Sequence, residues 1–304
     1  MHFEWQPRRR VWYTPPMTTL RVLLLLVLLA TRVGGAPVPV AGPTSVFAGG
    51  LAGPEGLAFL NDGTLAVGST TGLITRLAAN GSASTLANTG ESLAGLTTLR
   101  DGRLLAAAFG GGRIWVVDPD SGFASVYASG IAGPNFIVET RKRRVFVSAS
   151  LAGTIVDATG GVLVTAASGL NFPNGLALGG DGYLYVAELG LARISRLPLS
   201  PQGTLGPAEV YATGTPLADG IAFDRRGNLL VVGQDTLWVV DHVTRATTVL
   251  SSDPLFEWPS NLAFGRGRGF DKKSLFLANF GPALGDGTNV LRVGYTLRGA
   301  KLSR

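Results

Sequence analysis

The sequence predicts an all-β fold, a six-bladed β-propeller with four-stranded blades around a central axis. Two observations predict it. Six stretches of the chain resemble one another, and their corresponding positions lie 39 to 45 residues apart, which is the period of propeller blades. Between these positions the chain shows short apolar or alternating segments divided by Gly- and Asp-rich turns, without a helical period. Six blades closed into a ring remove most exposed sheet edges.

The repeat is clearest where each unit begins. Ser45–Glu55 matches Ser125–Asn135 residue for residue in kind, and Glu55 falls where Asn135 falls. In five of the six units an apolar residue opens the next strand ten residues later, as Leu65 follows Glu55. We call the six corresponding residues the axial positions. They are Glu55, Ala94, Asn135, Asn174, Asp219 and Ser260.

Each unit then follows the same order of elements. In the first unit, an inner strand begins near Gly56, Asn61–Thr64 forms a turn, and Leu65–Val67 and Leu73–Leu77 are strands. Residues 44–49 repeat the outer-strand pattern before the first unit, while residues 290–297 lack a following outer strand. We expect these two segments to pair and complete the sixth blade. The alternative is a frayed N-terminal extension.

A leader precedes the repeats. Val22–Ala30 is an apolar run of nine residues after Arg21, and small residues follow it up to Ala36. This pattern is typical of a secretory signal peptide, and the run is too short for a membrane span of about 20 residues. We expect a leader in residues 1–36, with Met17 as an alternative start, and a secreted propeller domain in residues 37–304. An uncleaved signal anchor is the competing interpretation.

Composition limits the chemistry. There is no cysteine, and His242 is the one histidine after the leader, so thiol catalysis, a His-rich zinc site and a His-dependent triad are disfavoured. Beyond residue 36 the chain has 21 basic and 19 acidic residues, a net charge of about +2. Nucleic-acid binding is therefore not expected, and the basic segments 141–144 and 266–273 are interpreted as solvated hairpins. Asn80, in Asn80-Gly-Ser82, is a glycosylation acceptor at an expected hairpin tip, although Asn-Gly is also a plain turn signal.

After thiol and histidine chemistry are set aside, side-chain oxygens remain as candidate metal ligands. The inner strands of a propeller converge on its axis, so Glu55, Asn135, Asn174 and Asp219 would bring two carboxylates and two amides to one cation. Such a set suits a hard ion, Ca²⁺ first, with Mg²⁺, Mn²⁺ or Zn²⁺ as alternatives. Asn174-Gly175 and Asp219-Gly220 are also turn dipeptides, whereas Glu55 has no turn role.

The connections after the second strands should lie at the same end of the ring. They supply a mixture of phenylalanines and small polar groups, and we expect Phe109, Glu188 and Phe280, together with Asn135, to contact the substrate. Glu188 directly ends a strand and is a reserve candidate for the general base; an ordinary surface position is the alternative. This rim suits a partly apolar ester or lactone.

Motifs at the axial positions resemble the senescence marker protein (regucalcin)/gluconolactonase family. They are Pro54–Phe59, Pro173–Leu178, Ala218–Asp224 and Trp258–Gly265. The resemblance implies a six-bladed propeller with one divalent metal on the axis, bound by Glu55, Asn174 and Asp219, with Asn135 lining the site. Sugar-lactonase members carry an Arg two residues before the position of Asn135. Here that residue is Gly133, which argues against a sugar acid.

These observations predict a metal-dependent hydrolase of a lactone or related ester. A cation would activate the carbonyl, a metal-associated water would attack, and Asp219 would serve as base and ligand. A carboxylate that binds a dication is a weakened base. We expect a small-molecule substrate, a monomer, and no nucleic-acid or membrane partner after leader removal. The alternative is a non-catalytic calcium-binding or protein-interaction propeller.

Overall fold

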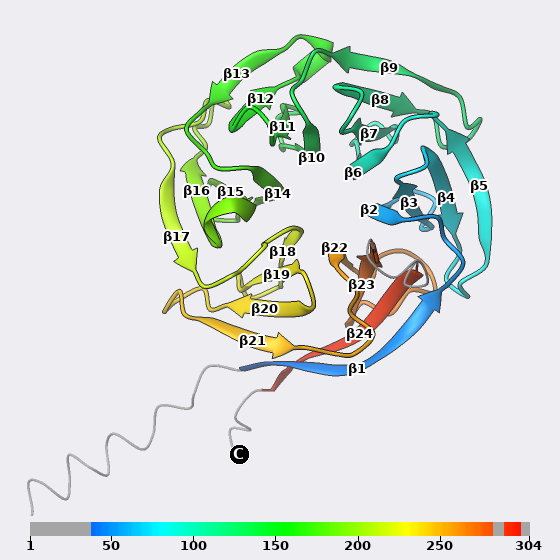
Figure 1. Ribbon diagram of the computed structural model, residues 1–304, viewed down its shortest axis with the longest axis vertical. Coiled ribbons are helices and arrows are strands. Elements are labelled where there is room, and N and C mark those ends of the chain that lie inside the picture. Colours follow the sequence, from blue (N-terminus) through cyan, green and yellow to red (C-terminus); the bar gives the residue numbers. More distant parts are fainter. Residues whose placement is uncertain (1–37, 282–288, 299–304) are drawn as a thin grey trace, which may run out of the picture. The chain divides into compact units, whose positions relative to one another are not determined.

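The computed structural model describes residues 38–281 and 289–298. The segment Pro39–Thr296 forms one compact unit, a ring of six four-stranded antiparallel sheets (Figure 1). The second unit, Met1–Val38 with Leu297–Arg304, lies almost wholly outside the described residues. The leader expected in residues 1–36 and its cleavage near Ala36 also fall outside them. The predicted six-bladed fold with four-stranded blades is confirmed.

Each blade has an inner strand, two middle strands and an outer strand. The inner strands, which lie nearest the middle of the ring in Figure 1, are β2 (Pro54–Phe59), β6 (Leu93–Thr98), β10 (Pro134–Glu139), β14 (Pro173–Leu178), β18 (Ile221–Phe223) and β22 (Pro259–Phe264). The second strands are β3 (Leu65–Ser69), β7 (Leu104–Ala108), β11 (Val145–Ala149), β15 (Tyr183–Glu188), β19 (Leu229–Gly233) and β23 (Ser274–Asn279).

The remaining strands lie toward the outside. The third strands are β4 (Leu73–Leu77), β8 (Arg113–Val117), β12 (Thr154–Asp157), β16 (Arg193–Pro198), β20 (Thr236–Val240) and β24 (Asn289–Arg298). The outer strands are β5 (Ala83–Asn88), β9 (Ala124–Ser129), β13 (Val164–Ala167), β17 (Glu209–Thr213), β21 (Thr247–Ser251) and β1 (Val38–Ala48). Two short 3₁₀ turns are η1 (Thr159–Gly161) and η2 (Leu189–Leu191). No helix in the described part of the chain is long and apolar enough to cross a membrane.

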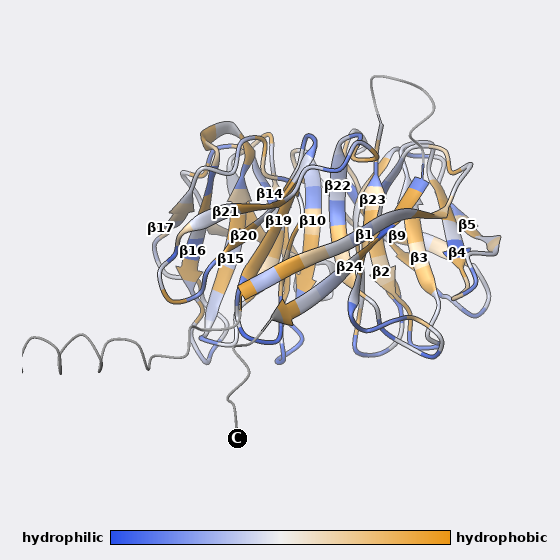
Figure 2. Cartoon of the chain, turned by 90° about the horizontal axis from the view of Figure 1, so that it is seen from below, coloured by the Kyte–Doolittle hydropathy of each residue, from blue (hydrophilic) through white to orange (hydrophobic). Residues whose placement is uncertain are grey.

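The sixth blade is built from both ends of the propeller. Its strand order is β1-β24-β23-β22, so the expected pairing of residues 44–49 with residues 290–297 is confirmed. Figure 2 shows β1 and β24 side by side along the edge of the ring. Pairing these strands removes two open sheet edges.

The core lies between adjacent blades. The second strands are buried along almost their whole length, which explains their continuous apolar sequences, such as Leu104–Ala108. Between blades six and one, Phe47, Phe59, Phe270 and Phe276 form a cluster with ring centroids 4.9 to 6.0 Å apart. Aromatic contacts of this kind add to the burial energy, and here they hold the two ends of the propeller together.

Candidate axial site

Five of the six inner strands bulge at their axial positions. In the first blade, Pro54 pairs with Ser69 and Gly56 pairs with Gly68, so Glu55 is an extra residue between them. The same irregularity occurs at the starts of β6, β10, β14 and β22. A bulge redirects a side chain away from the normal pleat. The repeated bulge therefore directs five of the axial side chains, while Asp219 lies just before β18 and is fixed by its main-chain nitrogen, which donates to the Val232 oxygen at 2.8 Å.

Glycines after the axial positions let the inner strands approach one another. A Cβ atom on Gly56 would lie 2.2 Å from the main-chain oxygen of Ala94, and one on Gly175 would lie 2.1 Å from that of Asp219. Neither glycine has a positive φ, and Gly175 lies within β14. Close backbone approach, rather than a turn, thus explains the Asn174-Gly175 pair.

Four side-chain oxygens at this level are buried and have no hydrogen-bond partner. They are Glu55 Oε2, Asn135 Oδ1, Asn174 Oδ1 and Asp219 Oδ1. Asn135, Asn174 and Asp219 are 5%, 3% and 3% exposed, while Glu55 retains some exposure. Buried polar atoms normally have a partner, so four orphans on converging strands indicate a site for an electropositive ligand.

The two carboxylates perturb each other. Burial raises the pKa of Glu55 from 4.5 to about 7, and the Ser260 hydroxyl offsets part of this rise. Burial also raises the pKa of Asp219 well above its usual value, and the charge of Glu55 raises it further. Two neighbouring buried carboxylates favour either a shared proton or a bound cation. The second option also satisfies the two amide oxygens.

The other two axial positions supply no free side-chain oxygen that could bind a cation. Ala94 has no polar side-chain atom, and the Ser260 hydroxyl donates to the main-chain oxygen of Glu55 at 3.0 Å. Within residues 38–281 and 289–298, no three His, Cys, Asp or Glu side chains gather at one place. A cation at the axis would therefore depend on Asn135 and Asn174 as well as on the carboxylates.

Asn135 is held in place by its neighbours. Its Nδ2 donates to Ser150 Oγ at 3.3 Å, and Ser150 Oγ donates to the main-chain oxygen of Pro173 at 2.7 Å. These contacts use the amide nitrogen and leave Oδ1 free. Ser150 follows the second strand β11, where the sequence predicts small polar groups at the rim, and its contacts with Asn135 and Pro173 give it a positioning role.

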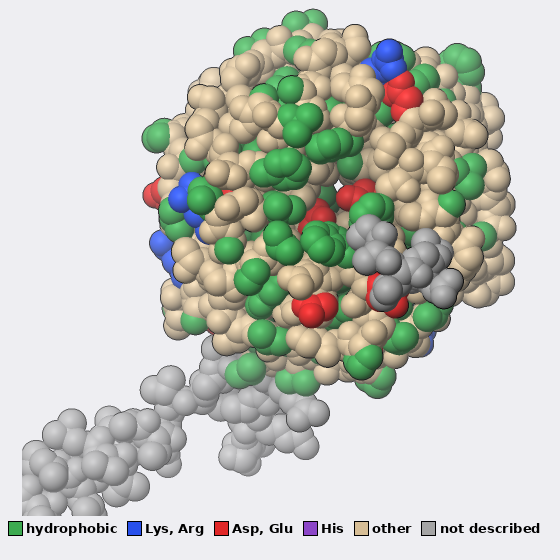
Figure 3. Space-filling view, viewed as in Figure 1, with side chains coloured by type: hydrophobic (Ala, Val, Ile, Leu, Met, Phe, Trp, Pro, Cys, Tyr) green, Lys and Arg blue, Asp and Glu red, His purple; other side chains and the backbone are tan. Residues whose placement is uncertain are grey.

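The mouth of the site is apolar. Figure 3 shows acidic side chains in a hollow at the middle of the ring, with hydrophobic side chains around it. Phe109 and Phe172 lie with ring centroids 6.3 Å apart. A Cβ atom on Gly133 would lie 2.7 Å from Leu151 Cγ and 3.2 Å from Phe109 Cε2. Leu151 and Phe109 thus occupy the space that a side chain at position 133 would need.

A strained backbone conformation recurs two residues before the axial positions. The left-handed residues there are Gly53, Gly133, Phe172, Leu217 and Trp258, with φ between 47° and 64°. Glycine adopts this conformation freely, whereas bulky residues rarely do. Large apolar side chains are therefore kept at the mouth in three blades despite a conformational cost. Nothing in the sequence pattern marks Phe172, Leu217 or Trp258 as site residues.

Phe280 lies at the same end of the ring, since its main-chain nitrogen donates to the Trp258 oxygen at 3.0 Å. Glu257 adjoins it: its Oε2 is buried without a partner, and its main-chain oxygen accepts from the Gly281 nitrogen at 2.7 Å. Sequence reasoning did not single out Glu257. Its position three residues before the axial Ser260 could have indicated that it lies near the site.

Glu188 is engaged in a buried ion pair. It is 0% exposed, and its oxygens accept from Arg193 Nε at 2.7 Å, from the Asn171 main-chain nitrogen at 2.8 Å, and from Ser195 Oγ. Burial raises its pKa, but these hydrogen bonds outweigh burial and leave the pKa below its usual value. The geometry therefore gives Glu188 a structural role, and we assign it neither as base nor as substrate contact.

Asn80 and His242 lie away from the axis. Asn80 is exposed between β4 and β5, where its Oδ1 accepts from the Ser82 nitrogen at 3.0 Å. The expected hairpin position is thus correct, and the glycan stays a prediction. His242 Nδ1 lies 3.0 Å from Asn228 Oδ1, consistent with a structural role.

Several solved structures share the fold. A gluconolactonase from Xanthomonas campestris superposes with a TM-score of 0.69 at 20% identity, covering 87% of this chain and 99% of that chain. A luciferin-regenerating enzyme gives a TM-score of 0.67 at 16% identity, over 85% and 95% of the two chains. A streptogramin B lyase gives 0.61 at 14% identity, over 84% and 98%. At these identities the likeness shows the fold alone.

No curated protein sequence matches the chain. The resemblance carried by the axial motifs is nevertheless confirmed, because a family profile aligns with most of the propeller. The profile of the SMP-30/Gluconolactonase/LRE-like region matches residues 42–279, and the chain therefore belongs to this family.

Proposed function

We propose that the protein hydrolyses a lactone or a related ester at the axial site, with the help of one divalent cation. The observation that carries this proposal is the group of four buried, unpartnered oxygens on Glu55, Asn135, Asn174 and Asp219. Membership of a family that includes gluconolactonases supports a lactone as substrate class. The secreted location suggested by the leader stays part of this proposal.

The donor set fits a hard dication. Two carboxylates and two amide oxygens match the ligands that Ca²⁺ prefers, and Mg²⁺, Mn²⁺ or Zn²⁺ are alternatives. Such an ion would neutralise the two like charges, of which that of Glu55 raises the pKa of Asp219. When bound, the cation would supply a Lewis acid for the substrate carbonyl.

The proton transfers of the reaction are assigned to side chains of the protein. Asp219 is the candidate general base, which takes a proton from the attacking water as the water oxygen bonds to the carbonyl carbon. The ring oxygen of the lactone then leaves as an alcohol after it gains a proton. Burial raises the pKa of Asp219 whereas a dication lowers it, so the two effects on its basicity oppose each other.

The mouth favours a substrate with an apolar part. Phe109, Leu151 and Phe172 form an apolar wall near Asn135, and the left-handed Gly133 stands where sugar-lactonase relatives carry an Arg. A polyhydroxylated sugar acid would find few partners on this wall. An alkyl- or aryl-substituted lactone would bury apolar area there and exclude water from the reaction. Phe280 contributes to the mouth from blade six.

A panel of aliphatic lactones, sugar lactones and aryl esters tests the proposal. Purified protein should hydrolyse the apolar lactones or esters fastest, lose activity with a chelator, and regain it when Ca²⁺ or another dication is restored. Absence of hydrolysis across the panel, together with tight cation binding, would favour the non-catalytic calcium-binding propeller instead.

A further inference from the structure

The inner strands carry a second set of equivalent residues at their other end. Each inner strand is followed by a turn in which the first residue donates its main-chain N–H back across the hairpin, at 2.8 to 2.9 Å in all six blades. These first residues are Leu60, Leu99, Thr140, Gly179, Asp224 and Gly265. We call the residues that follow them the turn positions: Asn61, Arg100, Arg141, Gly180, Arg225 and Arg266.

Each turn position lies six residues after an axial position. At a strand rise of about 3.3 Å per residue, the two sets are about 20 Å apart along the axis. The turn positions therefore encircle the face of the ring opposite the axial site. Four of the six are arginine, so this second ring is cationic.

The turn itself does not require arginine. Asn61 and Gly180 occupy the same position in turns with the same hydrogen bond, and asparagine and glycine are the ordinary turn residues. Local structure thus does not explain why arginine recurs at Arg100, Arg141 and Arg266.

The four guanidinium groups have no ion-pair or hydrogen-bond partner among the described residues. Two of the nearby acidic groups pair with other arginines: Asp62 with Arg76 at 3.3 Å and Asp101 with Arg103 at 2.7 Å. Glu139 keeps its negative charge beside Arg100, because its Oε2 accepts from the neutral main-chain nitrogen of Arg100 at 2.7 Å. The ring is thus positively charged overall, with one carboxylate beside Arg100.

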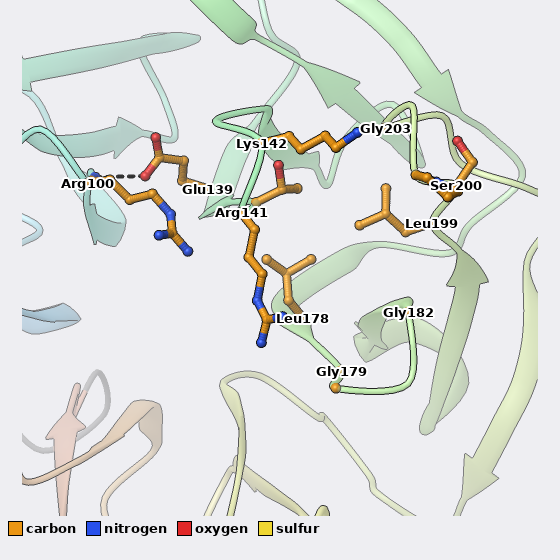
Figure 4. Close-up of a pocket in the computed structure, with 13 residues that line it drawn as sticks. Arg100, Glu139, Arg141, Lys142, Leu178, Gly179, Gly182, Leu199, Ser200 and Gly203 are labelled. Atoms are coloured by element: carbon orange, nitrogen blue, oxygen red, sulfur yellow. Dashed lines mark hydrogen bonds between the residues drawn. The ribbon is translucent and has the colours of Figure 1, made fainter.

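Two adjoining cavities connect three of these arginines. Arg100, Arg141 and Lys142 line a cavity of about 410 Å³, and Arg100, Arg266 and Asn61 line another of about 270 Å³. In Figure 4, Arg100 and Arg141 extend in the same direction, whereas Lys142 extends away toward Ser200 and Gly203. Arg100 and Glu139 belong to both cavities, so the two spaces form one arc.

We propose that this arc, formed by Arg266, Asn61, Arg100 and Arg141, binds a small anion that carries two or more phosphate groups. Guanidinium groups bind phosphate through paired N–H donors, and three of them in one arc match several phosphates. The joint size of the cavities suits a small molecule rather than a flat surface. Asn61, which also lines the arc, adds an uncharged side-chain donor.

Calorimetric titration of the whole protein with inorganic tripolyphosphate tests the proposal, at constant ionic strength so that general screening is fixed. Arg100→Gln, Arg141→Gln and Arg266→Gln should each weaken binding about tenfold, since each removes charge-assisted hydrogen bonds to phosphate. Arg143→Gln and Arg268→Gln each remove one positive charge from the same hairpins as Arg141 and Arg266, but not from a turn position. These matched controls should change affinity less than twofold.

Two outcomes would overturn the proposal. Equal loss in the control and arc variants would show general attraction to a basic face, and the absence of any tripolyphosphate binding would remove the site. Vesicles containing phosphatidylserine provide a separate arm: binding to vesicles without binding to tripolyphosphate would identify a membrane-facing surface instead. Lactone hydrolysis is not used in any arm, so the result is independent of the proposed function.

Discussion

Asp219 and Glu55 combine burial, charge and the lack of a partner in one place, and conservative substitutions separate their functional and structural roles. Asp219→Asn and Glu55→Gln keep shape while removing one charge from the site. Each should lower kcat for lactone hydrolysis by about 100-fold or more if the carboxylates bind the cation or act as base. Steady-state kinetics and circular dichroism on the same samples measure both effects.

Ala94 provides the internal control for this experiment. It occupies an axial position with a similar bulge but without a donor atom, so Ala94→Ser should leave activity within about twofold. Full activity of both carboxylate variants would contradict the metal-hydrolase proposal and favour a non-catalytic binding propeller.

Substitution of Phe172 should change substrate specificity with little change in stability. Phe172→Gly relieves a left-handed strain of roughly 1–3 kcal/mol, while glycine entropy costs about 0.5–1 kcal/mol and the lost ring contact about 0.5–1.5 kcal/mol. The melting temperature should therefore barely change. The ratio kcat/KM for an alkyl-substituted lactone should fall about tenfold, because apolar area is no longer buried.

The matched variant for this test is Leu217→Gly. Leu217 has the same backbone conformation in blade five, with φ of 50° against 47° for Phe172, but it does not belong to the Phe109 contact. An equal loss with an unsubstituted lactone would show that Phe172 acts on the reaction in general rather than on the apolar part.

At the scale of elements, closure of the sixth blade depends on β24. Tyr295 is buried, and its hydroxyl donates to Asp224 Oδ2 of blade five at 2.6 Å. Tyr295→Phe should lower the free energy of unfolding by about 1.5–3 kcal/mol, toward the lower end because Asn228 Nδ2 still donates to the same oxygen at 2.9 Å. Denaturant titration measures the change, with an unaltered m-value expected.

Tyr127→Phe is a suitable comparison, because the hydroxyl of Tyr127 has no hydrogen-bond partner in the described part of the chain. It should change stability by less than about 0.5 kcal/mol. If the two variants behave alike, the link between β24 and blade five contributes nothing measurable to ring closure.

Much of this element structure could be predicted from the sequence. A spacing of 39 to 45 residues, a ten-residue count in five of the six units and turn residues at regular places predict six similar sheets, and the unpaired first and last strands predict the closure. The bulges could not be predicted, since nothing in Pro54-Glu55-Gly56 distinguishes a bulged strand from a regular one. The left-handed Phe172 and Trp258 were also hidden, because residue preferences point away from that conformation.

The convergence of the axial side chains was predictable for a different reason, and their role as metal ligands stays a proposal. Glu55, Asn135, Asn174 and Asp219 share one place in the repeat, and the ring symmetry brings equivalent places together. Glu188 was less accessible to sequence reasoning, because its role depends on Arg193 and Ser195 across the hairpin. A strand-end carboxylate looks the same in sequence whether it is free or paired.

For the whole molecule, ligands from four blades should couple cation binding to folding. At free Ca²⁺ 100-fold above Kd, the gain in stability should be about 2.7 kcal/mol. Calorimetric melting with a chelator and with added Ca²⁺ measures it. A melting temperature indifferent to both would contradict the site.

The pH dependence has a definite sign. The pKa of Glu55 is raised from 4.5 to about 7 in the folded protein, so the folded state holds its proton more tightly than the unfolded state. The chelated protein should therefore lose stability as pH rises from about 4.5 to 7. Bound cation favours the ionised carboxylates, so the stabilisation by Ca²⁺ should grow across the same interval.

The repeated bulge has a consequence for how such proteins diversify. It fixes the direction of five axial side chains through the backbone, independently of what those side chains are. Substitutions at one codon per blade can then change the number of charges and donors at the axis while every loop keeps its length. Substitutions at the axial positions can thus exchange one ion or one chemistry for another, without passing through a misfolded intermediate.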